Sequence, residues 1–406
     1  MVRPERRTRA DILAAATIAV VVAVAAALIW WTSDARATIS RPAVVPAPNP
    51  TPAREVPAAL DQLWTAVSPR TTSPVLVAGT VVTGAGREVE GRDPVTGQAR
   101  WSYARDRDLC GVSWVYHYAV AVYPDSRGCG QVSTIDGSTG RRGPNRSSYA
   151  DKQVVLSSDG TTVLSAGVTR LELWRSDMVR MLAYGEIDAR IKPSSKGVGT
   201  GCVLLSSAAS SSAVSVLESC PEQADVRLTL LRPGEEEDEP ELRNVPEPGI
   251  AVDSGARVLV VSDTTTAIYL PAPQPRVVVV DDTGATVAST PLPEPPSPAS
   301  TVSRPGDLIT WWTGDSVIVF DAKLNYRYTV APAGSQLPLG PAAMMAGRLL
   351  LPVTGGLGVY DPATGANERY IPVSRPPGQG GPIVPVVTGS TVLEQRGDTV
   401  VALGRR

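Results

Sequence analysis

Alternating apolar and polar positions, interrupted by tight turns, dominate the chain from Leu60 to its end. The clearest turns are two nearly identical pentapeptides, DPVTG at 93–97 and DPATG at 361–365, each between two short alternating runs. The second run ends in an aromatic residue, Trp101 or Tyr370. Asp accepts hydrogen bonds from the backbone that follows it, Pro fixes φ, and Gly takes the positive-φ position. Each pentapeptide therefore predicts a β-hairpin.

Weaker copies of the hairpin turn recur at a regular spacing. The opening aspartate returns 43 residues later at Asp136, and Asp281, Asp321 and Asp361 follow one another at intervals of 40 residues. A period near 40 with about four strands per repeat indicates the blades of a β-propeller. Further turns are expected near residues 173, 230 and 398. The count is eight blades, or seven if the middle repeats merge.

The two ends of this region complement each other. Residues 60–64 have the character of the last strand of a repeat, whereas runs at 385–387, 391–394 and 399–403 resemble the first three. Pairing them would close the ring and remove its open edges. The predicted fold is therefore all-β, a single propeller over residues 59–406 that is closed by its N-terminal strand.

An apolar segment precedes the propeller. Residues 12–31 carry no charge and end in two tryptophans, and about 20 helical residues cross a hydrocarbon core of about 30 Å. The tail at 1–11 is basic (Arg3, Arg6, Arg7, Arg9), so we expect it to stay cytoplasmic. A single-pass protein of the cell membrane with an extracytoplasmic propeller follows. The alternative is a signal peptide cleaved after Ala37, which also exports the propeller.

Residues 32–58 form the predicted linker. Proline disfavours helix and favours extended chain, so this segment is expected to be a stiff spacer between membrane and propeller. Its prolines are Pro42, Pro46, Pro48, Pro50, Pro52 and Pro57.

Composition limits the function classes. The formal net charge is −2, which gives no electrostatic basis for binding nucleic acid. Aromatic residues make up 5% of the chain, so the core must consist mainly of Val, Leu, Ile and Ala.

The four cysteines form two closely spaced pairs. Cys110 and Cys129 are 19 residues apart, Cys202 and Cys220 are 18 apart, and each pair brackets a candidate hairpin. Because an exported domain meets an oxidising environment, we predict the disulfides Cys110–Cys129 and Cys202–Cys220. Zinc is the alternative, but His117 is the single histidine and no C-x-x-C spacing occurs.

The repeat resembles that of PQQ-like (quinoprotein-type) β-propellers. The resemblance covers roughly residues 60–406 and implies the propeller fold. The family includes quinoprotein dehydrogenases and non-catalytic members such as propeller lipoproteins that scaffold outer-membrane protein assembly. The anchored chain also resembles Ala/Val-rich membrane-anchored proteins of mycobacteria and other actinobacteria. The resemblance is carried by Asp93, Thr96, Gly97 and Trp101, with partial copies at Asp136, Thr139 and Gly140 and at Asp361, Thr364 and Gly365.

Chemistry-bearing residues are sparse. Quinoprotein dehydrogenases hold their cofactor with adjacent cysteines, a stacking Trp and calcium; this chain has no adjacent cysteines, and tandem Trp311-Trp312 in a strand would point to opposite faces. His117 has no evident triad partners and no G-x-S-x-G elbow occurs. The acidic run at 235–241 is interpreted as a solvated loop, with a cation or basic partner as the alternative. We therefore expect no catalytic, metal or cofactor-binding residue.

The preferred hypothesis is a non-enzymatic, membrane-anchored propeller that serves as a scaffold for an envelope or secreted protein. The alternative is a small-ligand sensor or enzyme that uses the central funnel. Convergent Asp, Arg and Tyr side chains in the funnel would favour the alternative, and a funnel filled by Val, Ala and Leu would contradict it.

Overall fold

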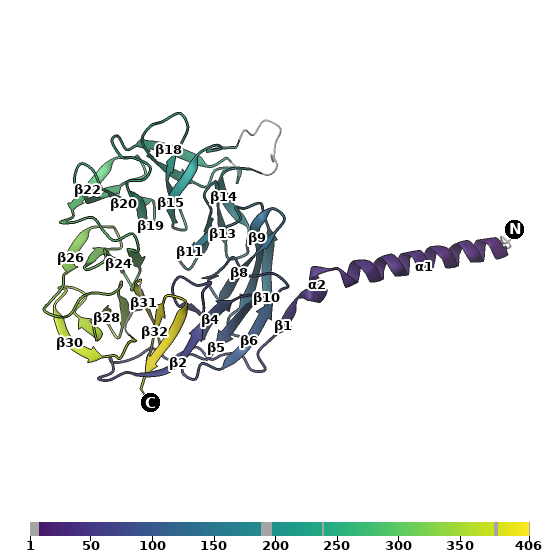
Figure 1. The fold of residues 1–406 in the computed structure, drawn as a ribbon, viewed down its shortest axis with the longest axis horizontal. Helices are drawn as coiled ribbons and strands as arrows, with labels where there is room; N and C mark the ends of the chain where they lie inside the picture. The colour runs from purple at the N-terminus through teal and green to yellow at the C-terminus, as the bar shows by residue number, and fades with distance from the viewer. Residues whose placement is uncertain (1–7, 188–196, 238, 377–380, 406) are drawn as a thin grey trace.

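The computed structural model describes residues 8–187, 197–237, 239–376 and 381–405. Within these residues the strands form eight sheets that follow one another around a ring (Figure 1). The prediction of an eight-bladed β-propeller is confirmed. Residues 1–7 of the predicted basic tail lie outside the described part of the chain.

Blades 2 to 7 are antiparallel meanders in which consecutive strands are neighbours. The first strand of each blade is innermost and the fourth is outermost. Blade 2 contains β7 (Gly111–Val115), β8 (Tyr118–Asp125), β9 (Gly128–Asp136) and β10 (Arg142–Ser147); blade 3 contains β11 (Val155–Ser158), β12 (Thr162–Ala166), β13 (Arg170–Arg175) and β14 (Arg180–Gly185); blade 4 contains β15 (Val203–Ala209), β16 (Val214–Ser219), β17 (Arg227–Arg232) and β18 (Glu241–Pro246); blade 5 contains β19 (Arg257–Ser262), β20 (Thr265–Leu270), β21 (Arg276–Val280) and β22 (Thr286–Pro291); blade 6 contains β23 (Thr301–Ser303), β24 (Leu308–Trp312), β25 (Val317–Asp321) and β26 (Tyr326–Val330); blade 7 contains β27 (Ala343–Met345), β28 (Arg348–Val353), β29 (Gly356–Tyr360) and β30 (Asn367–Pro372).

Blade 8 closes the ring as predicted. Its first three strands are β31 (Ile383–Thr388), β32 (Thr391–Arg396) and β33 (Thr399–Gly404), and its outermost strand is β2 (Asp61–Val67), which pairs with β33. The turn near residue 398 therefore joins the second and third strands, unlike the pentapeptide turns, which join the third and fourth. Blade 8 has no such turn because its fourth strand comes from the other end of the domain.

The core lies between neighbouring blades. The four consecutive valines Val277–Val280 of β21 are all buried, whereas the adjacent outer strand β22 is largely exposed. A strand covered on both faces needs apolar residues at every position, and a strand covered on one face needs them at alternate positions. This difference explains why the inner strands read as continuous aliphatic runs.

The pentapeptide turns connect neighbouring blades through aromatic side chains. Blade 1 contains β3 (Val75–Val77), β4 (Thr80–Ala85), β5 (Glu88–Arg92) and β6 (Ala99–Ala104). Trp101 on β6 donates its indole N–H to the Gly137 carbonyl in the blade 2 turn, at 2.6 Å. Trp64 on β2 donates in the same way to Pro94 in the blade 1 turn, at 3.0 Å. The aromatic residue of one repeat thus packs on the turn of the next.

The anchor candidate is a single long helix. Helix α1 (Arg9–Trp31) has no buried residue and begins with Thr8, whose side chain accepts a hydrogen bond from the Asp11 amide. It is long and apolar enough to cross a membrane by length and composition. A short helix, α2 (Asp34–Ala37), follows directly.

The linker differs from the expected spacer. Strand β1 (Ile39–Arg41) pairs with β6 and becomes a fifth strand of blade 1. Further on, Ala43 and Ala47 donate backbone hydrogen bonds to Thr139 and Ser138 of blade 2. An extended chain keeps its remaining amides and carbonyls free for a neighbouring surface, so residues 39–57 lie along the ring as a strap.

The strap ends on the other side of the closure. The guanidinium of Arg369, on β30 of blade 7, donates to the backbone carbonyls of Val56 and Pro57. Residues 39–57 therefore contact blades on both sides of the blade where the ring closes. The chain between α1 and the ring is reduced to residues 32–38.

Candidate functional site

A cavity of about 490 Å³ lies at the centre of the ring. Its lining comes from residues on or beside the innermost strands of seven blades, so it is the funnel of the propeller. The walls are mostly small or apolar: Ser73, Pro74, Leu76, Trp114, Ser157, Ser158, Ala208, Ala209, Leu259, Val260, Val302, Ser303, Arg304, Val384, Pro385 and Val386.

Arg304 is the one charged side chain among the described residues that line this cavity. It follows β23, and its guanidinium donates to the Val261 carbonyl at 2.6 Å. Surrounding protein lowers the pKa of Arg304, and the negative charge of Asp159 acts in the opposite direction. A guanidinium in an otherwise apolar funnel can attract a small anion. Of the convergent Asp, Arg and Tyr side chains that would favour a ligand-binding funnel, the described lining contains Arg304, with the charge of Asp159 acting on it.

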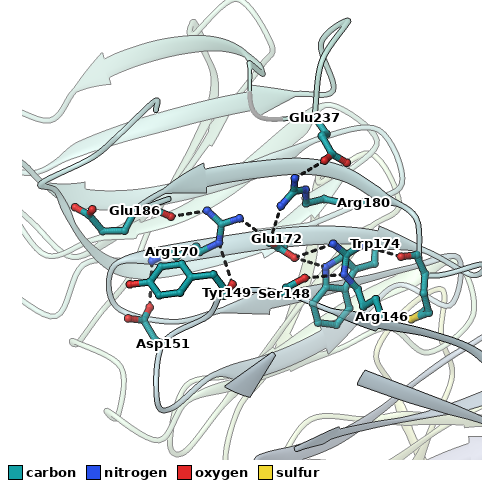
Figure 2. A network of polar contacts seen from close by, with 11 residues as sticks. Arg146, Ser148, Tyr149, Asp151, Arg170, Glu172, Trp174, Arg180, Glu186 and Glu237 are labelled. Atoms are coloured by element: carbon teal, nitrogen blue, oxygen red, sulfur yellow. Dashed lines mark hydrogen bonds and ion pairs between the residues drawn. The ribbon is translucent and has the colours of Figure 1, made fainter. Parts of the chain in front are cut away.

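The densest polar cluster surrounds Glu172, which is 3% exposed on β13 (Figure 2). One carboxylate oxygen accepts hydrogen bonds from Arg170 at 2.6 Å and from Arg180 at 2.9 Å. The other accepts the indole N–H of Trp174 at 2.8 Å and lies 3.5 Å from the Arg146 guanidinium. Three arginines thus surround one buried carboxylate.

The arginines of this cluster keep the Glu172 carboxyl in its ionised state. Burial raises the pKa of Glu172, but Arg170, Arg146 and Arg180 more than offset it, so the pKa lies below its ordinary value. The cluster also joins three blades, because Arg146 comes from blade 2 and Arg180 bonds Glu237 in the loop after β17 of blade 4. A carboxylate so enclosed is closed to a substrate, and we assign it a structural role.

The acidic run differs in part from the expected solvated loop. Glu237 forms the ion pair with Arg180, and its backbone carbonyl accepts the amide of Ala183 at 2.7 Å. This segment is therefore docked on blade 3 by its charge. Asp238 lies outside the described residues.

Both predicted disulfides are present in the structure. Cys202–Cys220 closes the mouth of the β15–β16 hairpin, as predicted. Cys110–Cys129 joins the start of β7 to the start of β9 across β8, so it does not bracket a single hairpin. In a meander, the first and third strands start at the edge where the second strand ends, and all four cysteines lie at this edge. The pentapeptide turns follow the end of the third strand, at the other edge. Both disulfides therefore lie on the face of the ring opposite the pentapeptide turns.

The other singled-out residues have structural environments. His117 is exposed in the turn between β7 and β8, 3.9 Å from the Asp136 carboxylate. Trp311 packs on Tyr269 of blade 5, with 6.1 Å between the ring centres, whereas Trp312 donates to the Pro338 carbonyl on the blade 7 side. The prediction of opposite faces is confirmed.

Comparisons with known proteins place the fold. The chain matches no protein-family model and no curated protein. Among solved structures it is similar to BamB from Moraxella catarrhalis, with 16% identity, a TM-score of 0.50, and coverage of 86% of this chain and 100% of that one. It is equally similar to the computationally designed Ika8 protein, with 13% identity, a TM-score of 0.51, and coverage of 85% and 98%. Likeness at such low identity supports the propeller fold alone and assigns neither a family nor an activity.

Proposed function

We propose that this chain is a non-enzymatic platform, held on a membrane by α1 with its propeller outside the cytoplasm, that binds an envelope or secreted protein. The observation that carries the proposal is the connection between anchor and ring. Only residues 32–38 separate α1 from β1, and β1 is itself a strand of blade 1. A ring fixed in this way presents its loops in a constant position, which suits a scaffold.

Three further features support the proposal. The sequence resembles a family whose non-catalytic members include scaffolds of outer-membrane protein assembly. The two disulfides suit an oxidising compartment outside the cytoplasm. The funnel walls are mostly apolar, with Arg304 as the charged exception among the described lining residues.

The test is site-specific photo-cross-linking in intact cells. A photoreactive amino acid replaces Val95, exposed in the blade 1 pentapeptide, or Val203, exposed beside Cys202 on the opposite face. We expect one of the two faces to give a discrete adduct with one envelope or secreted protein, identified by mass spectrometry. The control replaces residues 1–31 with a cleavable export signal, which should abolish the adduct. Background proteins alone from both faces would contradict the proposal.

A second candidate function uses the funnel. The guanidinium of Arg304 in a cavity of about 490 Å³ fits a small carboxylate- or phosphate-bearing ligand. Such ligands should raise the melting temperature of the wild type and leave Arg304→Gln unchanged. Equal responses of the two proteins would remove this candidate.

A further inference from the structure

The rim of blades 1 and 2 lies within short reach of the anchor. The seven residues 32–38 span at most about 25 Å when fully extended, and α2 shortens this reach because four of them are helical. Figure 1 shows α1 leaving the ring from the side where β1, β6 and β10 lie. If α1 crosses the bilayer, as the proposed function requires, this rim stands next to the lipid surface.

Four exposed arginines gather on this rim, and we call them the basic rim: Arg36, Arg41, Arg141 and Arg142.

Contacts across the two blades bring together the segments that carry the basic rim. The guanidinium of Arg142, on β10, lies 5.9 Å from the centre of the Tyr103 ring, and Tyr103 pairs with Ser40 on β1. Ala43, two residues after Arg41, donates to the carbonyl of Thr139, two residues before Arg141, so the segments that carry the arginines run close together although they belong to different blades.

The other end of the basic rim meets the anchor. The guanidinium of Arg36 lies 3.7 Å from the centre of the Trp31 ring, at the C-terminal end of α1. Tryptophan is enriched at the level of the lipid head groups. This contact places Arg36 at the same level.

Two valines project beside the arginines, and we call them the valine tip. Val44 is 100% exposed and Val45 is 66% exposed. Their backbone is fixed, because Ala43 and Ala47 on either side donate to Thr139 and Ser138, in the turn that precedes Arg141. Isolated exposed valines are ordinary in a soluble protein. Valines held outward on a fixed loop beside four arginines resemble the apolar and basic sides of an interfacial membrane site.

The carboxylate nearest in the chain to Arg141 and Arg142 is already engaged. Asp136 accepts hydrogen bonds from the hydroxyls of Ser138 and Thr139 and from the Thr139 amide. It shapes the turn, and Arg141 and Arg142 beyond it are exposed to solvent. Anionic phospholipids attract such juxtamembrane arginines.

We propose that the basic rim and the valine tip form a second membrane contact that binds anionic phospholipid head groups. The arginines contact the phosphates while Val44 and Val45 enter the boundary between head groups and acyl chains. The ring then stands on the rim of blades 1 and 2, and blades 4 to 6 are held away from the bilayer. This second contact rests on the proposed anchoring by α1, and it fixes the orientation of the ring relative to the bilayer.

The experiment uses the full chain in lipid nanodiscs. All four cysteines are in disulfides, so a single introduced cysteine carries an environment-sensitive fluorophore at a chosen site. The reporter site is Val45→Cys, and the control is Val287→Cys, which is 57% exposed on β22 of blade 5. Nanodiscs contain either phosphatidylcholine alone or phosphatidylcholine with phosphatidylglycerol.

We expect the fluorophore at residue 45 to shift its emission to shorter wavelength with phosphatidylglycerol, and to be quenched by lipids with a spin label near the head group. The fluorophore at residue 287 should show neither effect. In the Val45→Cys background, R41E/R141E/R142E should abolish the shift, whereas R41K/R141K/R142K should keep most of it. Far-ultraviolet circular dichroism of both triple variants shows whether the ring is folded.

Each outcome bears on the proposal. Equal spectra at residues 45 and 287 would overturn it while leaving anchoring by α1 intact. A shift that is the same with phosphatidylcholine alone, or that survives the glutamate variant, would overturn the role of anionic lipid. If the chain fails to co-elute with nanodiscs, anchoring itself fails and the proposed function fails with it.

Discussion

Trp101 of blade 1 donates its indole N–H to the carbonyl of Gly137 in blade 2, and its ring fills the space beside Gly140. A Cβ on Gly140 would overlap that ring, and the backbone there has φ of +70°. The repeat motif therefore encodes a joint between blades: the aspartate and threonine shape the turn, the glycine leaves room, and the tryptophan of the preceding blade occupies it.

The first prediction concerns this joint. Trp101→Ala removes a fully buried indole and should lower the free energy of unfolding by about 3–5 kcal/mol. Trp101→Phe keeps most of the apolar contact and leaves the Gly137 carbonyl without its donor, so about 1–3 kcal/mol is expected. Urea unfolding followed by circular dichroism measures both. The control is Tyr370→Phe, because the Tyr370 hydroxyl bonds its own blade at Thr354 and should matter little.

The second prediction concerns the buried carboxylate. Glu172→Gln leaves Arg146, Arg170 and Arg180 without their shared counter-charge and should destabilise the ring by about 3–5 kcal/mol. The exposed pair Arg348–Glu368 is the matched control, and Glu368→Gln should cost at most about 1 kcal/mol. Similar losses from both variants would contradict the structural role of the cluster.

The same variant has a defined pH dependence. The folded-state pKa of Glu172 lies below the ordinary value of 4.5, because three arginines outweigh its burial. Its contribution to stability is therefore complete above about pH 4.5 and is lost as the pH falls through the folded-state pKa. Wild type and Glu172→Gln should differ fully at pH 7 and converge under acid. If Glu172 were neutral in the folded state, thermal melts would show the opposite trend: the wild type would lose stability relative to Glu172→Gln as the pH rises above about 4.5.

The third prediction concerns a carboxyl group whose ionisation should lower the stability of the fold instead of raising it. Burial raises the pKa of Glu247, in the loop after β18, to about 6, although Arg276 lowers it in part. A raised carboxyl pKa means that stability decreases between about pH 4.5 and pH 6 and stays lower above that range. Glu247→Gln should therefore raise the melting temperature at pH 7.5 and leave it unchanged at pH 4. The surface variant Glu368→Gln should show no such difference.

The fourth prediction tests the strap. A Cβ on Gly79 would overlap the carbonyl of Pro48, whereas a Cβ on Gly86 would meet no atom within 4 Å. Both glycines have positive φ, so alanine strains the backbone similarly at either position, by about 1 kcal/mol. Hydrogen exchange at the Ala43 and Ala47 amides should accelerate in Gly79→Ala and stay slow in Gly86→Ala. Fast exchange in the wild type would show that the strap is not held on the ring.

The ring could be predicted from the sequence because the turn residues and the repeat interval indicate the same fold. The turn residues around Asp93 and Asp361 report backbone conformation directly, and the 40-residue intervals from Asp281 to Asp321 and from Asp321 to Asp361 report the blade. The closure by β2 was predictable because a repeat lacking three strands at one end needs three at the other. The spacing of the cysteines predicted both disulfide pairs. It did not predict that Cys110 and Cys129 are joined across the intervening strand β8.

The strap and the buried cluster were harder to predict. Proline content describes the stiffness of residues 32–58 and says nothing of the surface on which they lie. Arg170, Glu172 and Trp174 alternate along β13 and so share one face, which is a weak signal for a cluster. Arg146 and Arg180 join it from other strands, and no local pattern reports a contact between distant strands. The basic rim is likewise divided between β1 and β10.

The closure of blade 8 has a consequence for biosynthesis. Apart from the added edge strand β1, strand β2 is the first ring strand to be translated, and its partner β33 is the last, more than 300 residues later. Until then both strands have unpaired edges, and the ring cannot form its last blade. A chain cut short anywhere before β33 remains an open arc with exposed edges, which favours aggregation or proteolysis. The ring can therefore close only after β33 has been translated, because β33 is the strand that pairs with β2.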